Sequence, residues 1–179
     1  MSTLPRADRA ADVMDADHLR RAFGAFATGV TVVTVRGPSP RGMTANSFTA
    51  VSLDPALVLV CVDRGAVTHR ILEAADGFGV SVLGEGQEDM ARHFADRSRP
   101  MGADQFAAVD WHPGPATGAP LIDGALAQFE CETWRQYDGG DHTIFLGRVL
   151  TARRSPERDA LVFLGGRFRS LGPEREGAA

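Results

Sequence analysis

The sequence predicts a mainly β protein, an antiparallel barrel with short helical insertions. β-branched and apolar segments follow one another along the chain, glycine- and proline-rich turns join them, and the helical patterns are too few and short to cover a parallel sheet. At 179 residues with 44% apolar side chains, the chain suits one domain with a buried core. We expect this domain to span residues 17–171, between mobile polar arms at residues 1–16 and 172–179.

The first predicted elements are a helix and a β-hairpin. Apolar side chains recur at helical spacing behind Asp17, the expected N-cap, and Gly29 marks the expected stop. The members of this apolar stripe are Leu19, Ala22, Phe23 and Phe26. Residues 30–35 are all β-branched, and the turn-rich residues 36–42 connect them to a second strand.

The middle of the chain predicts strands separated by helices. Residues 57–62 are apolar throughout, so we expect a strand that is covered on both faces at the centre of the sheet. Three further elements follow by the same rules: a helix over 66–75, a strand over 78–83 and a helix over 87–96. The last of these helices places Met90 and Phe94 on one face, and the proline- and glycine-rich residues 100–119 predict a long surface loop.

The last part of the chain predicts a second hairpin and a closing strand. Residues 125–134 alternate between apolar and polar, which predicts a half-exposed strand with Glu130 and Glu132 on its solvated face. Turn residues then lead into a returning strand at 142–150, and residues 160–164 form the final strand. The expected total is about seven strands and about three short helices.

Composition excludes several functional classes. A net charge of −4 with scattered arginines offers no footprint for nucleic acid. No apolar run reaches the roughly 20 residues of a membrane span, and the N-terminus lacks the apolar stretch of a signal peptide, so we expect a cytoplasmic protein. All 19 basic residues are arginine, which excludes lysine Schiff bases and a Walker lysine. The histidines lack ligand spacing and Cys61 and Cys131 suit a core, so no metal site is expected.

The stretch after Arg41 is the most unusual in the chain. Residues 44–47 (TANS) combine short side chains, uncharged donors and accessible main-chain amides, a lining that suits a flat heterocycle with polar edges. A hydroxyl-rich edge strand that runs into an Asx or serine turn explains the same pattern equally well.

Residues 63–68 (DRGAVT) follow a predicted strand and open a predicted helix. Arg64, main-chain amides and Thr68 would then stand where a phosphate can bind at the helix N-terminus. Capping of that helix by Asp63 or Thr68 is the simpler alternative.

Two more side chains are candidates for a site. His142 lies at a hairpin exit, from which it could project into a cleft, although a hydrogen-bonded strand histidine is the simpler interpretation. Phe168 stands between Arg167 and Arg169 and suits an aromatic lid, with the arginines available for a diphosphate. An aromatic residue that anchors the chain end in the core is the alternative. The motifs GxSxG and GxGxxG are absent, which disfavours a hydrolase or a Rossmann domain.

Five segments together resemble the flavin reductase family, the small reductase components of two-component flavin-dependent monooxygenases. In family order they are residues 26–34 (FATGVTVVT), 42–55 (GMTANSFTAVSLDP), 78–83 (FGVSVL), 140–147 (GDHTIFLG) and 165–168 (GGRF). The similarity spans residues 17–171. It implies the FMN-binding split barrel, a Greek-key antiparallel β-barrel that is usually a homodimer.

The resemblance also implies roles for individual residues. The isoalloxazine pocket would be formed by Met43, Thr44, Ala45, Asn46, Ser47, Ser52, Leu53, Cys61, Val62 and Asp63. The flavin phosphate would bind at Arg64, Ala66 and Thr68, and further cofactor contacts would come from Phe94, Phe106 and Arg169. His142, the one expected catalytic residue, would lie with Phe168 over the outer flavin face, near the nicotinamide. Gln105 stands where many relatives have lysine, and Phe168 where relatives often have tyrosine.

The reaction that the resemblance implies is hydride transfer from NADH to the flavin N5 atom, followed by release of reduced flavin to a partner monooxygenase. Such a reaction needs two rings held in position rather than a strong acid or base. FAD is the expected flavin, with FMN as the second candidate, and NADH is favoured because no arginine cluster awaits a 2′-phosphate. Two alternatives are a tightly bound flavoprotein that reduces another acceptor and a non-catalytic flavin- or haem-binding split barrel.

Overall fold

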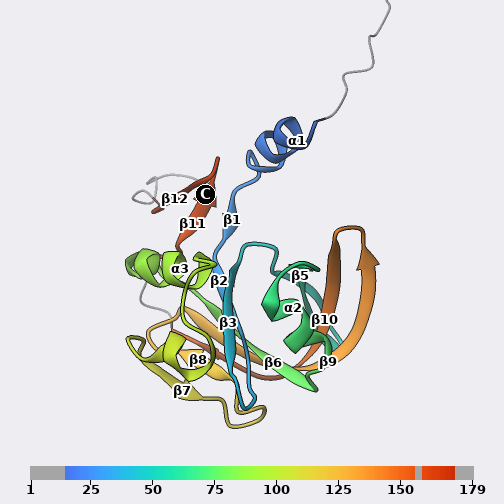
Figure 1. The fold of residues 1–179 in the computed structure, drawn as a ribbon, viewed down its shortest axis with the longest axis vertical. Helices are drawn as coiled ribbons and strands as arrows, with labels where there is room; N and C mark the ends of the chain where they lie inside the picture. Colours follow the sequence, from blue (N-terminus) through green and yellow to red (C-terminus); the bar gives the residue numbers. More distant parts are fainter. Residues whose placement is uncertain (1–14, 156–158, 172–179) are drawn as a thin grey trace, which may run out of the picture.

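The structure, a computed structural model, describes residues 15–155 and 159–171 (Figure 1). Apart from positions 15 and 16, the predicted arms at 1–16 and 172–179 lie outside the described residues. The described strands form three antiparallel sheets of seven, three and two strands. The mainly β, antiparallel prediction is therefore confirmed.

The seven-stranded sheet builds the body of the molecule. Across it lie β3 (Arg41–Ala45), β2 (Thr31–Val35), β6 (Gly77–Val82), β9 (Ala127–Gly139), β10 (His142–Arg154), β5 (Ala56–Asp63) and β4 (Thr49–Leu53). The predicted hairpins β2–β3 and β9–β10 both form, with their turns where glycine and proline gather. The sheet curls so that β3 and β5 come into contact, and the helix α2 (Val67–Glu73) packs against both strands (Figure 1). The result is a barrel that is split between β3 and β5.

The remaining elements surround this barrel. The small sheets consist of β1 (Thr28–Gly29), β11 (Val162–Leu164) and β12 (Arg167–Arg169), and of β7 (Trp111–Pro113) and β8 (Pro120–Ile122). The other helices are α1 (Ala16–Phe23), α3 (Glu88–Ala95), and the 3-10 turns η1 (Glu85–Gln87) and η2 (Gly102–Phe106). Of the strands beyond the predicted seven or so, β1, β7, β8 and β12 are only two or three residues long, whereas β4 has five.

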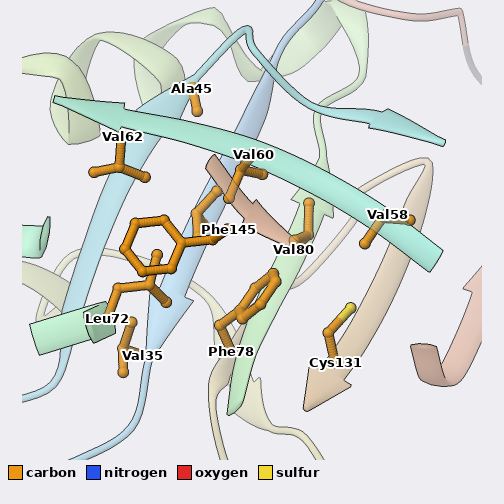
Figure 2. Packing of buried hydrophobic residues seen from close by; sticks show 11 residues of the cluster. Val35, Ala45, Val58, Val60, Val62, Leu72, Phe78, Val80, Cys131 and Phe145 are labelled. Carbon is orange, nitrogen blue, oxygen red and sulfur yellow. The ribbon is translucent and has the colours of Figure 1, made fainter. Parts of the chain in front are cut away.

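Two groups of buried side chains form the core. The first fills the barrel, where Phe78, Phe145 and Leu72 meet the valines of β5 (Figure 2). The second lies outside it, between β2, α3 and η2, and includes Phe94 and Phe106 with their ring centroids 5.3 Å apart. The helix α3 is thus attached to the barrel by apolar packing on the β2 and β3 side.

The prediction for residues 57–62 is wrong in its placement. β5 lies next to the edge strand β4, and only alternate residues, such as Val58 and Val60, are fully buried. Within the seven-stranded sheet, the strand that is buried along its whole length is β2. The reason is that α3 and β8 cover the outer face of β2, whereas the outer face of β5 has only partial cover.

The first helix also differs from its prediction. Its N-cap is Asp15, whose carboxylate accepts the backbone N–H of His18 at 2.6 Å, while Asp17 lies inside the first turn. The helix ends at Phe23, before the predicted stop, and no residue of α1 is buried. Phe23 and Phe26 are 71% and 77% exposed, so these two members of the apolar stripe are not covered by the residues that the structure describes. In Figure 1, α1 stands away from the barrel.

Residues 100–119 and Glu130 are more buried than predicted. The loop contains η2 and β7, and it is held by Glu130, which is fully buried rather than solvated. One carboxylate oxygen of Glu130 accepts the backbone N–H groups of Ala116 and Thr117 at 2.9 and 2.7 Å and the Thr117 hydroxyl at 2.9 Å. The other accepts the Thr151 hydroxyl at 2.8 Å. Burial alone would raise the pKa of Glu130, but these donors outweigh it and hold the pKa below its usual value.

Replacement of this carboxylate tests its role. We expect Glu130→Gln to lower the free energy of unfolding at neutral pH by about 1–3 kcal/mol, because the amide leaves buried donors without acceptors. The stabilisation by Glu130 is complete above the unfolded carboxyl pKa of about 4.3 and is lost as pH falls through the lower folded-state pKa. Urea unfolding at several pH values should therefore show the difference from wild type narrowing under acid conditions.

The matched control for that experiment is Glu132→Gln on the same strand. Glu132 makes a partly exposed ion pair with Arg148, 2.7 Å from carboxylate to guanidinium, so its loss should cost below about 1 kcal/mol. Equal losses in the two variants, or a difference between Glu130→Gln and wild type that does not change with pH, would contradict this account.

Candidate functional site

Two adjoining cavities lie along the open side of β3. The larger has a volume of about 310 Å³ and the smaller about 140 Å³. Thr44 and Ala95 line both of them. The wall of the larger cavity is made by Arg41, Met43, Thr44, Asp63, Gly65, Ala66, Val67, Thr68, Phe94, Ala95, Arg97 and Arg99. The wall of the smaller is made by Val30, Thr44, Asn46, Ala95, Phe163 and Phe168.

The polar residues at 44–47 have two kinds of environment. The Thr44 hydroxyl donates to the Ala91 carbonyl at 2.7 Å and so ties β3 to α3. The Ser47 hydroxyl donates to the Cys61 carbonyl at 2.9 Å and accepts the Cys61 N–H at 3.0 Å. Asn46 is exposed and lines the smaller cavity. The two hydroxyls therefore bond to backbone groups, as the edge-strand interpretation predicts. Thr44 and Asn46 also line the smaller cavity.

The turn before α2 brings some of the predicted phosphate residues to the larger cavity. Ala66 and Thr68 line it, and Thr68 is buried. Ala66, not Asp63 or Thr68, is the N-cap residue, so the capping alternative is wrong; the Asp63 carboxylate instead accepts the Gly65 N–H at 2.7 Å. Arg64 points elsewhere, since its guanidinium donates to the His142 carbonyl at 3.3 Å and pairs with Asp138 at 3.1 Å.

His142 and Phe168 do not meet within this chain. His142 begins β10 opposite Asp63, and its Nδ1 lies 2.7 Å from the Asp141 carboxylate, a hydrogen bond that lowers the pKa of Asp141. Phe168, on β12, lines the smaller cavity and packs against Phe163 with ring centroids 5.4 Å apart. The β9–β10 turn and β12 lie on opposite sides of Figure 1.

Several predicted contact residues line neither cavity. Ala45 and Val62 are buried in the barrel interior, and Phe106 is buried behind Phe94. The others are Ser47, Ser52, Leu53, Cys61, Arg64, His142 and Arg169, of which Leu53 is 96% exposed on the edge strand β4. Phe106 is kept from both cavities because η2 folds inward, where the sequence suggested a surface loop. Gln105 is buried beside it and accepts the Gly42 N–H at 3.0 Å.

Three arginines line the larger cavity although no sequence pattern indicated them. Arg41 and Arg99 are only 4% and 8% exposed, whereas the side chain of Arg97 is 94% exposed and lies 3.8 Å from Asp63. Burial lowers the pKa of Arg41, and burial together with the Arg41 charge lowers the pKa of Arg99 to about 10. No local pattern signals this pair, because its members come from distant parts of the chain.

The two cysteines are free thiols, and neither belongs to a cluster of metal ligands among the described residues. Cys131 is buried, and burial together with Glu130 raises the pKa of its thiol to about 12. Cys61 is half-buried, and burial raises its pKa as well. Within residues 15–155 and 159–171, no three His, Cys, Asp or Glu side chains gather as metal ligands would, and no helix is long and apolar enough to cross a membrane.

Comparison with known protein families identifies the class to which this split barrel belongs. Residues 23–172 match the family described as a flavin reductase like domain. The chain belongs to this family.

The similarity to individual proteins extends over most of the chain. It is 61% identical over 165 residues to an NADH-dependent FAD reductase from Streptomyces globisporus, covering 92% of this chain and 91% of that relative. The solved structure of the Streptomyces globisporus C-1027 NADH:FAD oxidoreductase SgcE6 in complex with NAD and FAD fragments has a TM-score of 0.87 at 59% identity, over 90% of this chain and 96% of that one.

A second solved structure is BorF, the flavin reductase component of a bacterial two-component tryptophan halogenase. Its TM-score is 0.85 at 56% identity, over 90% of this chain and all of that one. The FMN-binding split-barrel fold that the sequence resemblance implied is therefore confirmed.

Proposed function

We propose that this protein is an NADH-dependent flavin reductase that reduces free FAD, and also FMN, and supplies the reduced flavin to a separate flavin-dependent monooxygenase. The observation that carries the proposal is a pair of joined cavities, cationic in one part and aromatic in the other, in a member of the flavin reductase family. The similarity to an NADH-dependent FAD reductase and to a reductase component of a two-component system supports the choice of NADH, FAD and a partner enzyme.

The cavity residues fit a phosphorylated flavin. Arg41 and Arg99 are buried cations on the wall of the larger cavity, and Phe163 and Phe168 form an apolar side of the smaller one. Such a wall can hold a ring and an anionic tail at the same time. When bound, the flavin supplies the chemistry, because its ring accepts a hydride from the nicotinamide. No strong acid or base is needed from the chain.

The chain's own residues would bind and orient the two rings. The main chain at Met43, Thr44 and Ala45 would run along the flavin edge, with the Asn46 amide as a donor or acceptor. Phe168 would cover one face of the flavin ring. Arg92 lies over Phe168 with its guanidinium 5.1 Å from the ring centroid, a contact that helps to hold the aromatic side chain in place.

His142 is the residue that we assign to the nicotinamide. It neighbours Asp63, which lines the larger cavity, and Asp141 holds its Nδ1 side, so Nε2 is left to face a ligand. The Nε2 atom placed there would orient a polar group of the nicotinamide through a hydrogen bond.

We also propose that the protein works as a homodimer. Phe23, the last residue of α1, and Phe26, just beyond it, leave an apolar surface that nothing within the described chain covers, and a second copy of this chain is the proposed partner. A cytoplasmic location, as the sequence predicts, suits an enzyme that uses NADH. The domain at 17–171 would be sufficient for activity.

The first experiment measures NADH oxidation by the purified protein with FAD, with FMN and without added flavin. We expect rapid turnover that depends on added flavin, with FAD preferred. Turnover without added flavin, by protein that keeps its flavin through gel filtration, would favour a tightly bound flavoprotein with another acceptor. No turnover with either flavin and with NADH or NADPH would contradict the enzyme and leave a binding protein.

The role of His142 is tested by steady-state kinetics of His142→Ala. We expect the KM for NADH to rise by about tenfold, since one hydrogen bond to the nicotinamide is lost, while the KM for FAD changes less than about twofold. His18→Ala on the exposed first helix is the control and should match wild type. Equal rises in both KM values would count against this assignment.

The proposed dimer is tested by sedimentation velocity. We expect wild type to sediment as a dimer and the double variant Phe23→Asp, Phe26→Asp to sediment as a monomer, because charges would replace the apolar contact. Leu150→Asp, an exposed position on β10, is the control. A monomeric wild type, or a double variant that remains dimeric, would show that α1 is not the contact.

A further inference from the structure

Two buried arginines meet at the wall of the larger cavity. Arg41 is the first residue of β3, and Arg99 lies in the segment that follows α3, so these two parts of the chain each bring one guanidinium to the cavity wall. Both are more than nine-tenths buried. Neither forms an ion pair with a carboxylate of residues 15–155 or 159–171.

The existing partners of these arginines are almost all neutral. Arg41 donates through Nη1 to the Pro100 carbonyl at 3.2 Å and contacts the Met101 sulfur at 2.9 Å. Arg99 donates to the backbone carbonyls of Asp96 and Gly42. The Nε atoms of both arginines are buried and have no acceptor among the described residues. These carbonyls fix the guanidinium groups in position, but they do not neutralise the charges.

Burial of two like charges lowers the free energy of unfolding unless a bound anion accompanies them. Arginine remains charged at neutral pH even when buried, and two buried cations repel each other more strongly than two exposed ones. The lowered pKa of Arg99, caused by burial and by Arg41, reflects that strain. At about 10 it still leaves the guanidinium protonated at neutral pH. The charge of Asp96 offsets part of this effect on Arg99 without forming an ion pair with it, and a bound anion would supply the rest of the balancing negative charge.

We propose that Arg41 and Arg99 together bind the phosphate or diphosphate group of the flavin, in place of the role that the sequence suggested for Arg64. The guanidinium fork suits phosphate oxygens, and the buried hydroxyl of Thr68 lines the same cavity. Because Thr44 and Ala95 connect this cavity to the one lined by Phe168, the phosphate and the ring of one molecule can occupy both.

The other two arginines nearby are poorer candidates. Arg64 is engaged by Asp138 and by the His142 carbonyl and does not line the cavity. Arg97 lines it but is almost fully exposed and is paired with Asp63, so water and that carboxylate screen its charge. This inference rests on the proposed function for the identity of the ligand, but not for the presence of an anion site.

The anion site is tested first with inorganic pyrophosphate, by titration calorimetry on the full chain. We expect wild type to bind pyrophosphate and Arg41→Met and Arg99→Met each to weaken it at least about tenfold, since a charged hydrogen-bond partner is lost. Arg154→Met, an exposed position at the end of β10, should bind as wild type does. Failure of wild type to bind pyrophosphate, or equal weakening in Arg154→Met, would overturn the proposal.

The ligand's identity is tested with three flavins in the NADH oxidation assay. Riboflavin lacks the phosphate that FMN carries and the diphosphate that FAD carries. We expect both arginine variants to raise the KM for FAD and FMN about tenfold or more and to leave the KM for riboflavin and for NADH near wild type. An equal rise for riboflavin would show a general disruption of the pocket. A rise for NADH alone would place the nicotinamide dinucleotide at the pair, and either result overturns the flavin assignment.

The two experiments separate this inference from the proposed function. If no flavin is reduced but pyrophosphate binding still requires both arginines, the function is wrong and the anion site remains. If flavin is reduced normally by both variants, the function remains and the inference is wrong. Arg41→Lys and Arg99→Lys cover the case in which a methionine variant does not fold. They keep the charge but lose the fork, so pyrophosphate should bind more weakly than to wild type and more tightly than to a folded methionine variant.

Discussion

The structure depends on one strand edge that is not paired with another strand. β3 hydrogen-bonds to β2 on one side, and on the other side the barrel is split. Side chains satisfy part of this open edge instead: the Gly42 N–H donates to Gln105, and the Gly42 carbonyl accepts from Arg99. The Thr44 hydroxyl, which donates to the Ala91 carbonyl, adds a link to α3. These side-chain contacts leave the edge accessible to a ligand but disfavour pairing with a further strand.

The open edge explains where the cavities lie and what lines them. A paired strand would bring a neighbour to within about 4.8 Å of β3 and leave no space there. α3 and η2 pack against β3, and the open edge of this strand borders the larger cavity. The main chain of β3 can therefore contact a ligand there. Gly42 is required here, because a Cβ would lie 2.7 Å from the ring of Phe94. The close approach of α3 also carries Ala95 and Phe94 into the cavity wall.

The charges follow from the same arrangement. Arg99 reaches the Gly42 carbonyl because the segment after α3 runs back along β3, and this route places its guanidinium near that of Arg41. Two fixed cations at one part of a cavity and aromatic rings at another suit a ligand with an anionic tail and a flat ring. The larger cavity is also lined by Arg97, whose side chain is almost fully exposed, and a site that opens to solvent suits a ligand that has to leave after it is reduced. In that respect the site differs from a prosthetic-group pocket, which would enclose its cofactor more fully.

The local elements could be predicted from the sequence alone: the hairpins, the helices α2 and α3, and the five segments that identify the family. Period-two and helical patterns depend on neighbours in the chain, so they can be recognised without the fold. Three features depend on tertiary contacts. Glu130 is buried, and β2 rather than β5 is covered on both faces. Arg64 pairs with Asp138 away from the larger cavity, whereas Arg41 and Arg99 both line that cavity. Segments that are distant in sequence determine whether a polar side chain is buried and which groups it contacts. An alternating strand pattern does not indicate which loop will cover the polar face of that strand.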